Sequence, residues 1–371
     1  MTQSSLSSVA VKELAEFVHR KGHIHFRLSE STRPDEGIIF QKKYQQIVKK
    51  KLASYKKELS LSGIFDDGDD KLRISGRLDG YDVIDESTVL VEEIKTTRND
   101  PSTVFDLLGS VHLAQAKLYA GLIAIENPFS RYWVKLTYLH PDTLKTKCYE
   151  EMYTKENVLE FWHLSCSDYM EWVKALGRHR QNIVSELQAL RFPYAGFRGD
   201  QRRVASHVYR SARDGQDLLL DAPTGSGKTI ATIFPAIKAM GKGIVDRIVY
   251  STARVTGQKT ILAAIERISS ALKAEPLTCI TLTARERICF NPEVSCDPGV
   301  CEFANGYYDR VKPALKELLS LRVADQQQVE RIARMYRVCP YYLGAHAARW
   351  ADVIVCDYNH VFDPFAHYPN L

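Results

Sequence analysis

The segment "APTGSGKT", residues 222–229, constrains the fold of this chain more than any other. It follows the apolar run "DLLLD", residues 217–221, and precedes an apolar stretch with helical spacing. Gly225 and Gly227 allow the backbone to curl so that its N–H groups converge on phosphate oxygens, and the N-terminus of the next helix adds favourable partial charge. The segment predicts a strand, a phosphate-binding loop and a helix, although Ala222 stands where the pattern usually has its first glycine.

The side chains of this loop predict a site for ATP. Lys228 is expected to reach the β- and γ-phosphates, and the hydroxyl of Thr229 is expected to ligate Mg²⁺. The alternative is a glycine turn that contains Lys-Thr by chance, which the flanking strand and helix patterns disfavour. The loop residues predicted to bind ATP are Ala222, Pro223, Thr224, Gly225, Ser226, Gly227, Lys228 and Thr229.

An aromatic residue and a glutamine precede this unit. In "FRGDQ", Phe197 is followed four residues later by Gln201. An aromatic ring can stack on adenine and an amide can hydrogen-bond to it, so we predict that both residues bind ATP. The same spacing is common on any helix surface, so the prediction depends on the phosphate loop that follows.

Two later apolar runs, residues 246–253 and 351–359, have the character of buried strands. Strands that alternate with helices predict a parallel, doubly wound sheet. A cysteine-rich region, about residues 279–345, is expected to interrupt this sheet as an insertion.

A segment rich in Pro, Gly and aromatic residues, 191–199, predicts a boundary between a domain of residues 1–190 and a domain of residues 191–371. The periodicity within the first domain predicts both strands and helices. The expected elements are helices over 36–58, 109–125 and 155–190, strands over 72–85 and 87–97, and a hairpin over 131–153.

The first domain carries a carboxylate pair beside a lysine. Asp79 lies at the end of one predicted strand, and Glu93 and Lys95 share one face of the next, because side chains alternate along a strand. Asp79 and Glu93 can hold Mg²⁺ or Mn²⁺, which can activate water for attack on a phosphodiester. Lys95 can orient that water, and Gln115 and Tyr119, one turn apart on the following helix, complete the predicted catalytic set.

Other interpretations of this set stay open. The simplest is a solvated strand edge, on which alternating glutamate and lysine carry no function. Glu92 replaces Glu93 as the ligand if the strand register differs by one residue. Candidates for completing the metal shell are Glu36, Gln41, His23 and His25.

The first residues have no apolar core like that of a signal peptide, and no apolar run approaches the roughly 18 residues of a membrane span. We therefore expect an intracellular, cytoplasmic chain without a membrane partner, in which thiols stay reduced. The net charge of +5 permits a nucleic-acid partner without requiring one.

Four cysteines form a candidate metal site. Cys289, Cys296 and Cys301 lie within "ICFNPEVSCDPGVC", and Cys339 follows in "VCPYYL". Four thiolates fit either tetrahedral zinc or an iron–sulfur cluster. The gaps do not form the paired knuckles typical of structural zinc, and proline after the last cysteine is typical of cluster-binding runs. The spacing favours a cluster, with zinc and unligated thiols as alternatives.

Residues 191–371 resemble the first motor domain of the XPD/DinG-like superfamily-two DNA helicases. The motifs that match, in order, are "FRGDQ", "DAPTGSGKT", "VYSTARVTGQ", "LTARERICFNPEV" and "CPYYLGAHAARWADVIVCDYNHVFDP". The resemblance implies a RecA-like P-loop motor that moves 5′ to 3′ on DNA and hydrolyses ATP, and we expect it to act in DNA repair or processing. It also implies that Thr252 and Arg254 touch the DNA backbone. The ligands that it implies for a 4Fe-4S cluster are Cys289, Cys296, Cys301 and Cys339.

Residues 1 to about 190 resemble a RecB-type PD-(D/E)XK nuclease domain. The resemblance rests on the five residues of the predicted catalytic set, Asp79, Glu93, Lys95, Gln115 and Tyr119. The resemblance implies a restriction-endonuclease-like α/β fold and metal-dependent cleavage of DNA. Gln41 stands where many members of the family have a metal-binding histidine. An alternative function is therefore a silent nuclease fold that serves the motor as a DNA-binding clamp.

In the helicase family a DEAH box follows soon after the position of "DYNHVFDP", whereas this sequence ends at Leu371. We expect an N-terminal fragment without the Walker B carboxylates and without the second motor domain. Such a fragment is expected to bind nucleotide weakly and not to unwind DNA.

Overall fold

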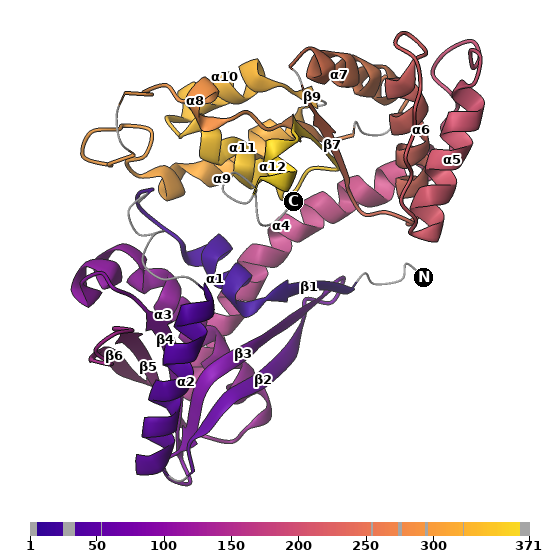
Figure 1. The fold of residues 1–371 in the computed structure, drawn as a ribbon. Helices are drawn as coiled ribbons and strands as arrows, with labels where there is room; N and C mark the ends of the chain where they lie inside the picture. The colour runs from indigo at the N-terminus through magenta and orange to yellow at the C-terminus, as the bar shows by residue number, and fades with distance from the viewer. Residues whose placement is uncertain are drawn as a thin grey trace. The chain divides into compact units, whose positions relative to one another are not determined.

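The computed structural model divides into two compact units, Met1–Ala175 and Leu176–Leu371 (Figure 1). Each unit has its own sheet and is described by itself. The residues that the structure describes are 6–24, 34–52, 54–253, 255–273, 277–293, 296–321 and 323–363.

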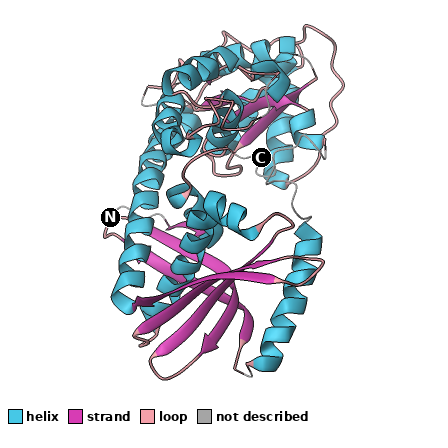
Figure 2. Ribbon diagram, turned by 90° about the vertical axis from the view of Figure 1, so that its left-hand side faces the viewer, coloured by secondary structure: helices cyan, strands magenta, loops and turns pink. Residues whose placement is uncertain are grey.

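The first unit is built on a mixed six-stranded sheet, whose strands fan out between helices in Figure 2. Its order is β1-β3-β4-β5-β6, with β2 paired to β3 as an additional strand. The central pair β4–β5 is parallel, whereas β3–β4 and the predicted hairpin β5–β6 are antiparallel. The strands are β1 (Leu6–Ala10), β2 (Lys56–Asp66), β3 (Lys71–Val83), β4 (Thr88–Thr96), β5 (Arg131–Leu139) and β6 (Thr146–Thr154).

Four helices accompany this sheet: α1 (Val11–His19), α2 (Pro34–Lys51), α3 (Pro101–Glu126) and α4 (Lys155–Ala189). The helix predicted over 36–58 ends earlier, at Lys51, because residues from Lys56 onward pair with β3. Helix α2 packs on β4, and α3 packs on β2, β4 and β5.

Helix α3 forms the core of the first unit. Asp100 caps it by accepting a hydrogen bond from the Thr103 N–H at 2.9 Å, and Pro101 occupies its first turn. By length and composition alone this helix could cross a membrane, but 67% of its most apolar window is buried within the protein. Such burial is typical of the central helix of a globular unit.

The second unit contains a parallel sheet of order β7-β10-β8-β9, in agreement with the predicted parallel α/β class. The predicted strands over 246–253 and 351–359 are β7 (Ile248–Thr252) and β10 (Val353–Asp357). Beside them lie β8 (Cys279–Thr281) and β9 (Val323–Ala324). Helices of this unit include α5 (Gln201–Asp214), α6 (Lys228–Gly241), α7 (Val255–Ser269) and α12 (Asn359–Phe362).

The prediction of a strand immediately before the phosphate loop is wrong. Residues 217–221 have no regular secondary structure, and the side chain of Leu219 is fully exposed. The physical reason is the lack of a partner, because none of the four described strands of this sheet pairs with the segment.

The predicted domain boundary lies between residues 190 and 191, whereas the two compact units of the structure divide after Ala175. Helix α4 continues past that point, and its last turns contribute Ile183 and Leu187 to the hydrophobic core of the second unit. Leu190, just after the helix, joins the same core. The segment before residue 191 therefore packs with the second unit.

The predicted insertion follows β8 and is mostly helical. It contains α8 (Arg285–Ile288), α9 (Tyr307–Ser320), α10 (Gln326–Tyr336) and α11 (Pro340–Ala348). Between α9 and α10 the chain returns to the sheet, because β9 pairs in parallel with β8. The insertion is thus anchored to the sheet at its middle as well as at its ends.

Two glycines in helices provide a test of the packing around α3. A Cβ atom at Gly121 would lie 2.5 Å from the Trp162 Cβ, whereas one at Gly37 in α2 would meet only Thr96, at 3.8 Å. Gly121→Ala should lower the free energy of unfolding of the first unit by about 1–3 kcal/mol. Gly37→Ala should leave it unchanged or raise it by up to about 1 kcal/mol. Urea unfolding measures both, and stabilisation by Gly121→Ala would contradict the packing.

Candidate functional site

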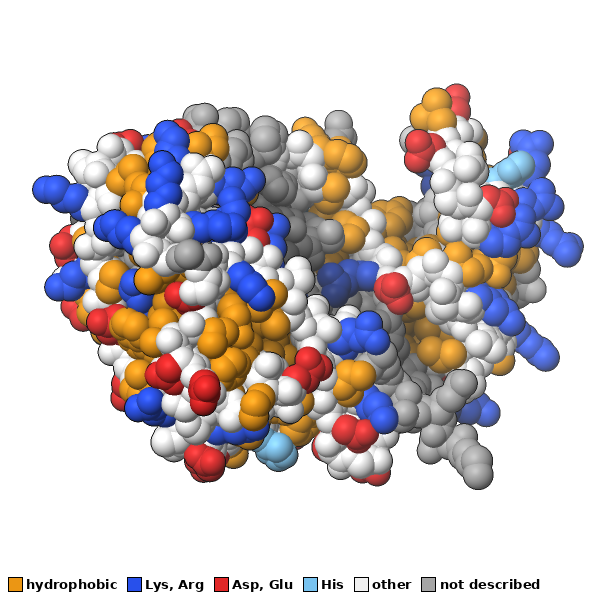
Figure 3. Space-filling view, turned by 90° about the horizontal axis from the view of Figure 1, so that it is seen from below, with side chains coloured by type: hydrophobic (Ala, Val, Ile, Leu, Met, Phe, Trp, Pro, Cys, Tyr) orange, Lys and Arg blue, Asp and Glu red, His pale blue; other side chains and the backbone are white. Residues whose placement is uncertain are grey.

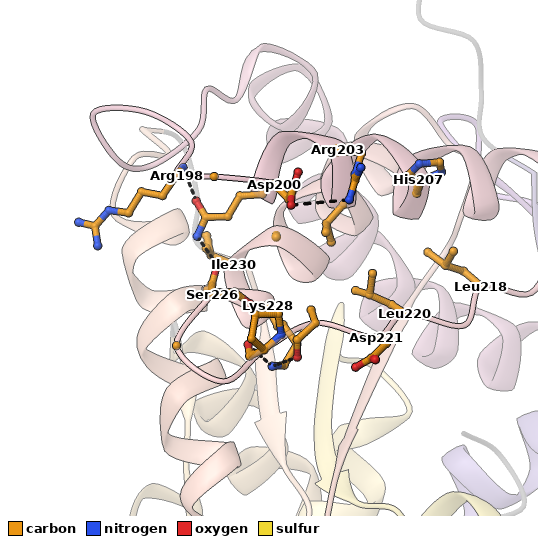
Figure 4. Close-up of a pocket in the computed structure, with 18 of the residues that line it drawn as sticks. Arg198, Asp200, Arg203, His207, Leu218, Leu220, Asp221, Ser226, Lys228 and Ile230 are labelled. Carbon is orange, nitrogen blue, oxygen red and sulfur yellow. Dashed lines mark hydrogen bonds and ion pairs between the residues drawn. The ribbon is translucent and has the colours of Figure 1, made fainter.

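The phosphate loop lines a cavity of about 820 Å³ in the second unit (Figure 4). Gly225 and Gly227 have left-handed φ values of 78° and 76°, and α6 begins directly after them at Lys228. Only glycine adopts this backbone without strain, and the conformation turns successive N–H groups toward one side of the loop. The local geometry is that of an anion-binding loop at a helix N-terminus.

The ammonium group of Lys228 is folded onto its own loop. Its Nζ donates to the carbonyl oxygens of Ala222 at 2.8 Å and Pro223 at 2.7 Å, as the dashed lines in Figure 4 show. These contacts hold the cation at the cavity wall, where a phosphate can take the place of the carbonyls. Ser226 also lines the cavity, while Thr224 and Thr229 are not among its lining residues.

Gln201 connects the segment before α5 to the phosphate loop. Its Nε2 donates to the Ser226 carbonyl at 3.0 Å, and its Oε1 accepts from the Arg198 N–H at 2.9 Å. A Cβ atom at Gly227 would lie only 2.0 Å from this Nε2, so the contact requires glycine there. The amide therefore holds the loop, and it also lines the cavity.

Phe197, which is predicted to bind ATP, packs beside another aromatic residue. Its ring stacks on Phe192, with centroids 3.9 Å apart, and it is not among the residues that line the cavity. Tyr194 lines the cavity in its neighbourhood, and the guanidinium of Arg267 lies 4.3 Å from the Tyr194 ring. Sequence reasoning missed this tyrosine, whose position in the same aromatic segment was the available signal. It also missed the lining residues Arg198, Arg203, His207 and Asp221.

The predicted carboxylate set is brought together in the first unit. Asp79 lies close to β4, where its Oδ2 accepts the Ile94 N–H at 2.8 Å. Its Oδ1 accepts from Gln41 Nε2 at 2.5 Å, so Gln41, one of the candidates for completing the shell, contacts it. Glu36 instead pairs with Arg98 at 3.1 Å, on the surface.

The side chains of Glu93 and Lys95 lie on the same face of β4, which is the face toward helix α3. Glu93 Oε1 lies 2.7 Å from Lys95 Nζ, which also donates to Gln115 Oε1 at 2.9 Å. Tyr119 donates its hydroxyl to the Arg77 carbonyl at 3.1 Å. The glutamine orients the lysine, and the tyrosine fixes α3 against β3.

Burial perturbs the pKa of both carboxyl groups. Burial raises the pKa of Asp79 to about 8, with a further contribution from the charge of Glu93. Burial also raises the pKa of Glu93, despite the opposing charge of Lys95, and its Oε2 is buried without a hydrogen-bond partner. Two buried carboxylates with one unpaired oxygen suit a divalent cation, whose charge favours the ionised form. Within the described ranges, however, no group of three His, Cys, Asp or Glu side chains could hold a metal.

The alternative ligand Glu92 points away from this set. It is fully buried and accepts from Tyr44 at 3.0 Å, Tyr55 at 2.8 Å and Thr137 at 2.6 Å. Lys135 Nζ lies 3.3 Å from its Oε1. Glu92 is therefore saturated by structural contacts.

The remaining candidates for the metal shell are two histidines. His23 lies four residues after the end of α1 and is half-buried. His25 lies outside the described residues.

A small cavity of about 290 Å³ opens beside Asp79. Gln115 and Tyr119 line it together with Lys12, on the first turn of α1, and Arg77, on β3. The charge of Lys12 also acts on Glu93, whose pKa it lowers slightly against the effect of burial. Sequence reasoning missed both cations, because neither belongs to the catalytic pattern.

The four cysteines of the insertion are free thiols in one region of the second unit. Burial raises the pKa of Cys296, and the charges of Cys289 and Cys301 add to that effect. Burial likewise raises the pKa of Cys339 to about 11, with small contributions from Cys296 and Cys289. Cys296 thus lies within electrostatic reach of the other three thiols, but no three of the four converge on a metal-sized site in the part of the chain described.

Of the two residues predicted to touch DNA, one is described. Thr252 ends β7, where its carbonyl accepts the Tyr358 N–H at 3.2 Å and its side chain packs near Gly257. Arg254 lies outside the described residues.

The raised pKa of Asp79 predicts a pH dependence of stability. The folded chain without metal binds more protons than the unfolded chain between about pH 4 and pH 8, so the free energy of unfolding should fall as pH rises through this window. One such group contributes at most about 1.4 kcal/mol per pH unit. Asp79→Asn should remove the contribution of Asp79 to this slope, and Asp85→Asn, on the exposed β3–β4 turn, should retain it.

Manganese gives a second measurement on the same variants. At pH 8, Mn²⁺ should raise the melting temperature of the wild type and of Asp85→Asn but not that of Asp79→Asn, because bound cation stabilises the folded state. An equal pH slope and an equal response to Mn²⁺ in all three proteins would contradict the assignment of Asp79.

Comparison with known families points to helicases in the second half of the chain. Residues 198–284 match the sequence model of the DEAD/DEAH box helicase family, and residues 252–368 match the DEAD_2 model. The chain is 21% identical over 198 residues to the General transcription and DNA repair factor IIH helicase subunit XPD of Dictyostelium discoideum, covering 47% of this chain and 26% of that protein. It is 22% identical over 220 residues to the Regulator of telomere elongation helicase 1 of Bos taurus, covering 46% and 18%.

Among solved structures, one titled XPD_Helicase superposes with a TM-score of 0.34 at 18% identity, over 47% of this chain and 30% of that one. One titled Truncated XPD gives a TM-score of 0.28 at 19% identity, over 44% and 46%. Both scores are too low to establish a shared fold. The chain spans about a quarter or less of the length of the curated relatives named above. The sequence matches support an XPD-like superfamily-two helicase motor in the second unit of this chain.

Proposed function

We propose that the chain belongs to an ATP-dependent DNA helicase of the XPD type that moves 5′ to 3′ and acts in DNA repair. The observation that supports this most directly is the phosphate loop with its two left-handed glycines, within a segment that matches helicase family models. The proposal concerns the whole protein, because a helicase motor needs further parts than the matched segment.

The residues around the loop have separate tasks in this proposal. The N–H groups of the glycine turn and the ammonium of Lys228 bind the phosphates, after that ammonium leaves the carbonyls of Ala222 and Pro223. Gln201 holds the loop in shape through Ser226. Bound Mg²⁺ supplies charge that offsets the phosphates, and Thr229, at the start of α6, is the proposed protein ligand.

A 4Fe-4S cluster held by Cys289, Cys296, Cys301 and Cys339 is part of the same proposal. Four free thiols, of which Cys296 lies within electrostatic reach of the other three, supply the required donor chemistry. The similarity to XPD supports the assignment. Such a cluster would join the end of α8 to the start of α11, because Cys289 and Cys339 are the cap residues there.

For the first unit we propose metal-dependent cleavage of DNA. Asp79 and Glu93 would hold Mg²⁺ or Mn²⁺, which activates water and neutralises charge on the phosphodiester when bound. Lys95, held in place by Gln115, is positioned to orient the attacking water. The neighbouring cations Lys12 and Arg77 would attract the phosphates of the strand into the cavity.

Local cations matter here because the net charge is small. Figure 3 shows Lys and Arg side chains interspersed with hydrophobic and acidic ones on the face seen from below. The net charge of +5 is modest for a chain of 371 residues. DNA binding is therefore assigned to specific sites near the cavities.

A second candidate function for the first unit is a DNA-binding clamp without catalysis. The observation that favours it is Gln41, a neutral amide, as the side chain that contacts Asp79 on the side of α2. With two carboxylates and no third acidic or histidine ligand in the described part, the metal affinity of this site would be low.

Nucleotide binding is tested with two lysines near the ends of α6. Lys228→Ala should weaken binding of a fluorescent ATP analogue by about 10- to 100-fold, since a charge-assisted contact contributes about 1.5–3 kcal/mol. Lys242→Ala, at the exposed C-terminal end of the same helix, should bind like the wild type. Equal affinities for the two variants, measured by titration, would contradict the phosphate-site assignment.

Cleavage is tested on single-stranded DNA with Mn²⁺. The wild type should cut, and Lys95→Ala should be slower by about 100-fold, because it removes a preorganised cation. Lys145→Ala, on the exposed β5–β6 turn, is the matched control and should cut normally. If the wild type binds DNA but does not cut it, the result would contradict the nuclease function and support the DNA-binding clamp.

A further inference from the structure

The proposed cluster ligands lie on separate turns of the insertion, so their spacing depends on contacts between those turns. Cys301 lies in the turn that leads to α9, and Cys339 is the N-cap residue of α11. Arg310, in the first turns of α9, lies between these two places in the sequence. Its guanidinium contacts backbone groups near Cys301 and near Cys339.

The contacts of Arg310 are with backbone carbonyl oxygens. On one side, Nε donates to Tyr336 at 3.2 Å and to Arg337 at 3.3 Å, and Nη2 donates to Arg337 at 2.7 Å. On the other side, Nη2 donates to the carbonyls of Asn305 and, at 3.4 Å, of Glu302. One guanidinium therefore joins two loop segments.

These two segments adjoin the cysteines. Glu302 directly follows Cys301, and Arg337 precedes Cys339 by two residues. The carbonyls of Tyr336 and Arg337 lie at the C-terminal end of α10, where they have no partner within the helix. A planar guanidinium with five N–H donors satisfies several such carbonyls at once, and its positive charge favours a helix C-terminus.

The backbone is shaped to admit this side chain. Gly306 has a φ of 60°, and a Cβ atom there would lie 2.6 Å from Arg310 Nη1. Arg337, just after α10, also has a left-handed φ of 53°, which turns its carbonyl toward the guanidinium. Gly306 and Arg337, both with positive φ, thus lie on either side of the Arg310 side chain.

A surface ion pair joins the same two segments but is expected to contribute little. Arg337 Nη2 lies 3.0 Å from Glu302 Oε2, and the two side chains are 69% and 56% exposed. Ion pairs this exposed are screened by solvent and salt. The guanidinium of Arg310, which donates to several carbonyl oxygens, is the stronger link between the two segments.

We propose that Arg310 is a positioning residue, which holds the Cys301 turn against the Cys339 turn before metal binds. The proposal deepens the assigned cluster and rests on it for its purpose. The link itself consists of hydrogen bonds from one guanidinium to backbone carbonyls, so it does not require a bound metal.

The experiment compares the wild type, Arg310→Gln, Arg310→Lys and Arg331→Gln, all as the full chain. Arg331 is the matched control, because it lies on the exposed side of α10, where its Nε donates to the Gln328 side chain at 3.1 Å. Amide hydrogen exchange is measured on the metal-free proteins over residues 301–306 and 333–339. Iron loss to a chelator is measured on anaerobically purified protein.

In Arg310→Gln, exchange should accelerate in both segments together, and iron should be lost about tenfold faster than from the wild type. Arg310→Lys should accelerate exchange nearly as much, because an ammonium lacks the fork, and Arg331→Gln should match the wild type. Faster exchange across the whole second unit would indicate general unfolding and would overturn the positioning role, as would a change in only one segment or in none. A wild type that holds no iron would refute the proposed cluster, while the exchange data would still decide the role of Arg310.

Discussion

A carboxylate with no exposure to solvent determines the arrangement of the first unit. Glu92 lies in the central strand β4, and taking its charge out of water is costly unless every oxygen has partners. Tyr44, Tyr55 and Thr137 donate hydroxyl groups to it, and Lys135, its register partner on β5, supplies a positive charge. Burial and this carboxylate together raise the pKa of both tyrosines, which therefore remain protonated donors. Any shift of β4 or α2 would leave a buried charge without its hydrogen bonds, so the network fixes their register.

That register has a consequence on the opposite face of the strand. Because successive side chains alternate, fixing Glu92 toward α2 directs Glu93 and Lys95 toward α3. The same helix α2 that supplies a tyrosine to Glu92 supplies Gln41 to Asp79. The structural network and the proposed catalytic set are therefore two faces of one strand, and the first holds the second in place.

Local patterns account for the parts that were predicted, and long-range packing accounts for those that were not. The glycines of the phosphate loop and the alternation around Glu93 are local signals, so the sequence alone indicates their conformation. The position of Phe197 depends on Phe192, which local spacing does not reveal. The apolar run around Leu219 has strand character, but a strand also requires a neighbouring edge, and no described strand provides one. Arg310 carries no motif, since its importance depends on carbonyls that only the folded turns bring together.

In the proposed nuclease, Asp79 and Glu93 together form a cation site, next to a lysine that the fold has oriented. Anomalous diffraction from crystals of the chain grown with Mn²⁺ tests this site most directly, because the peak identifies the metal position independently of activity. We expect a peak within about 2.0–2.5 Å of a carboxylate oxygen of each residue, the usual range for hard cations with oxygen ligands. A map with Mn²⁺ elsewhere, and with Lys95 still paired to Glu93 at an empty site, would contradict it.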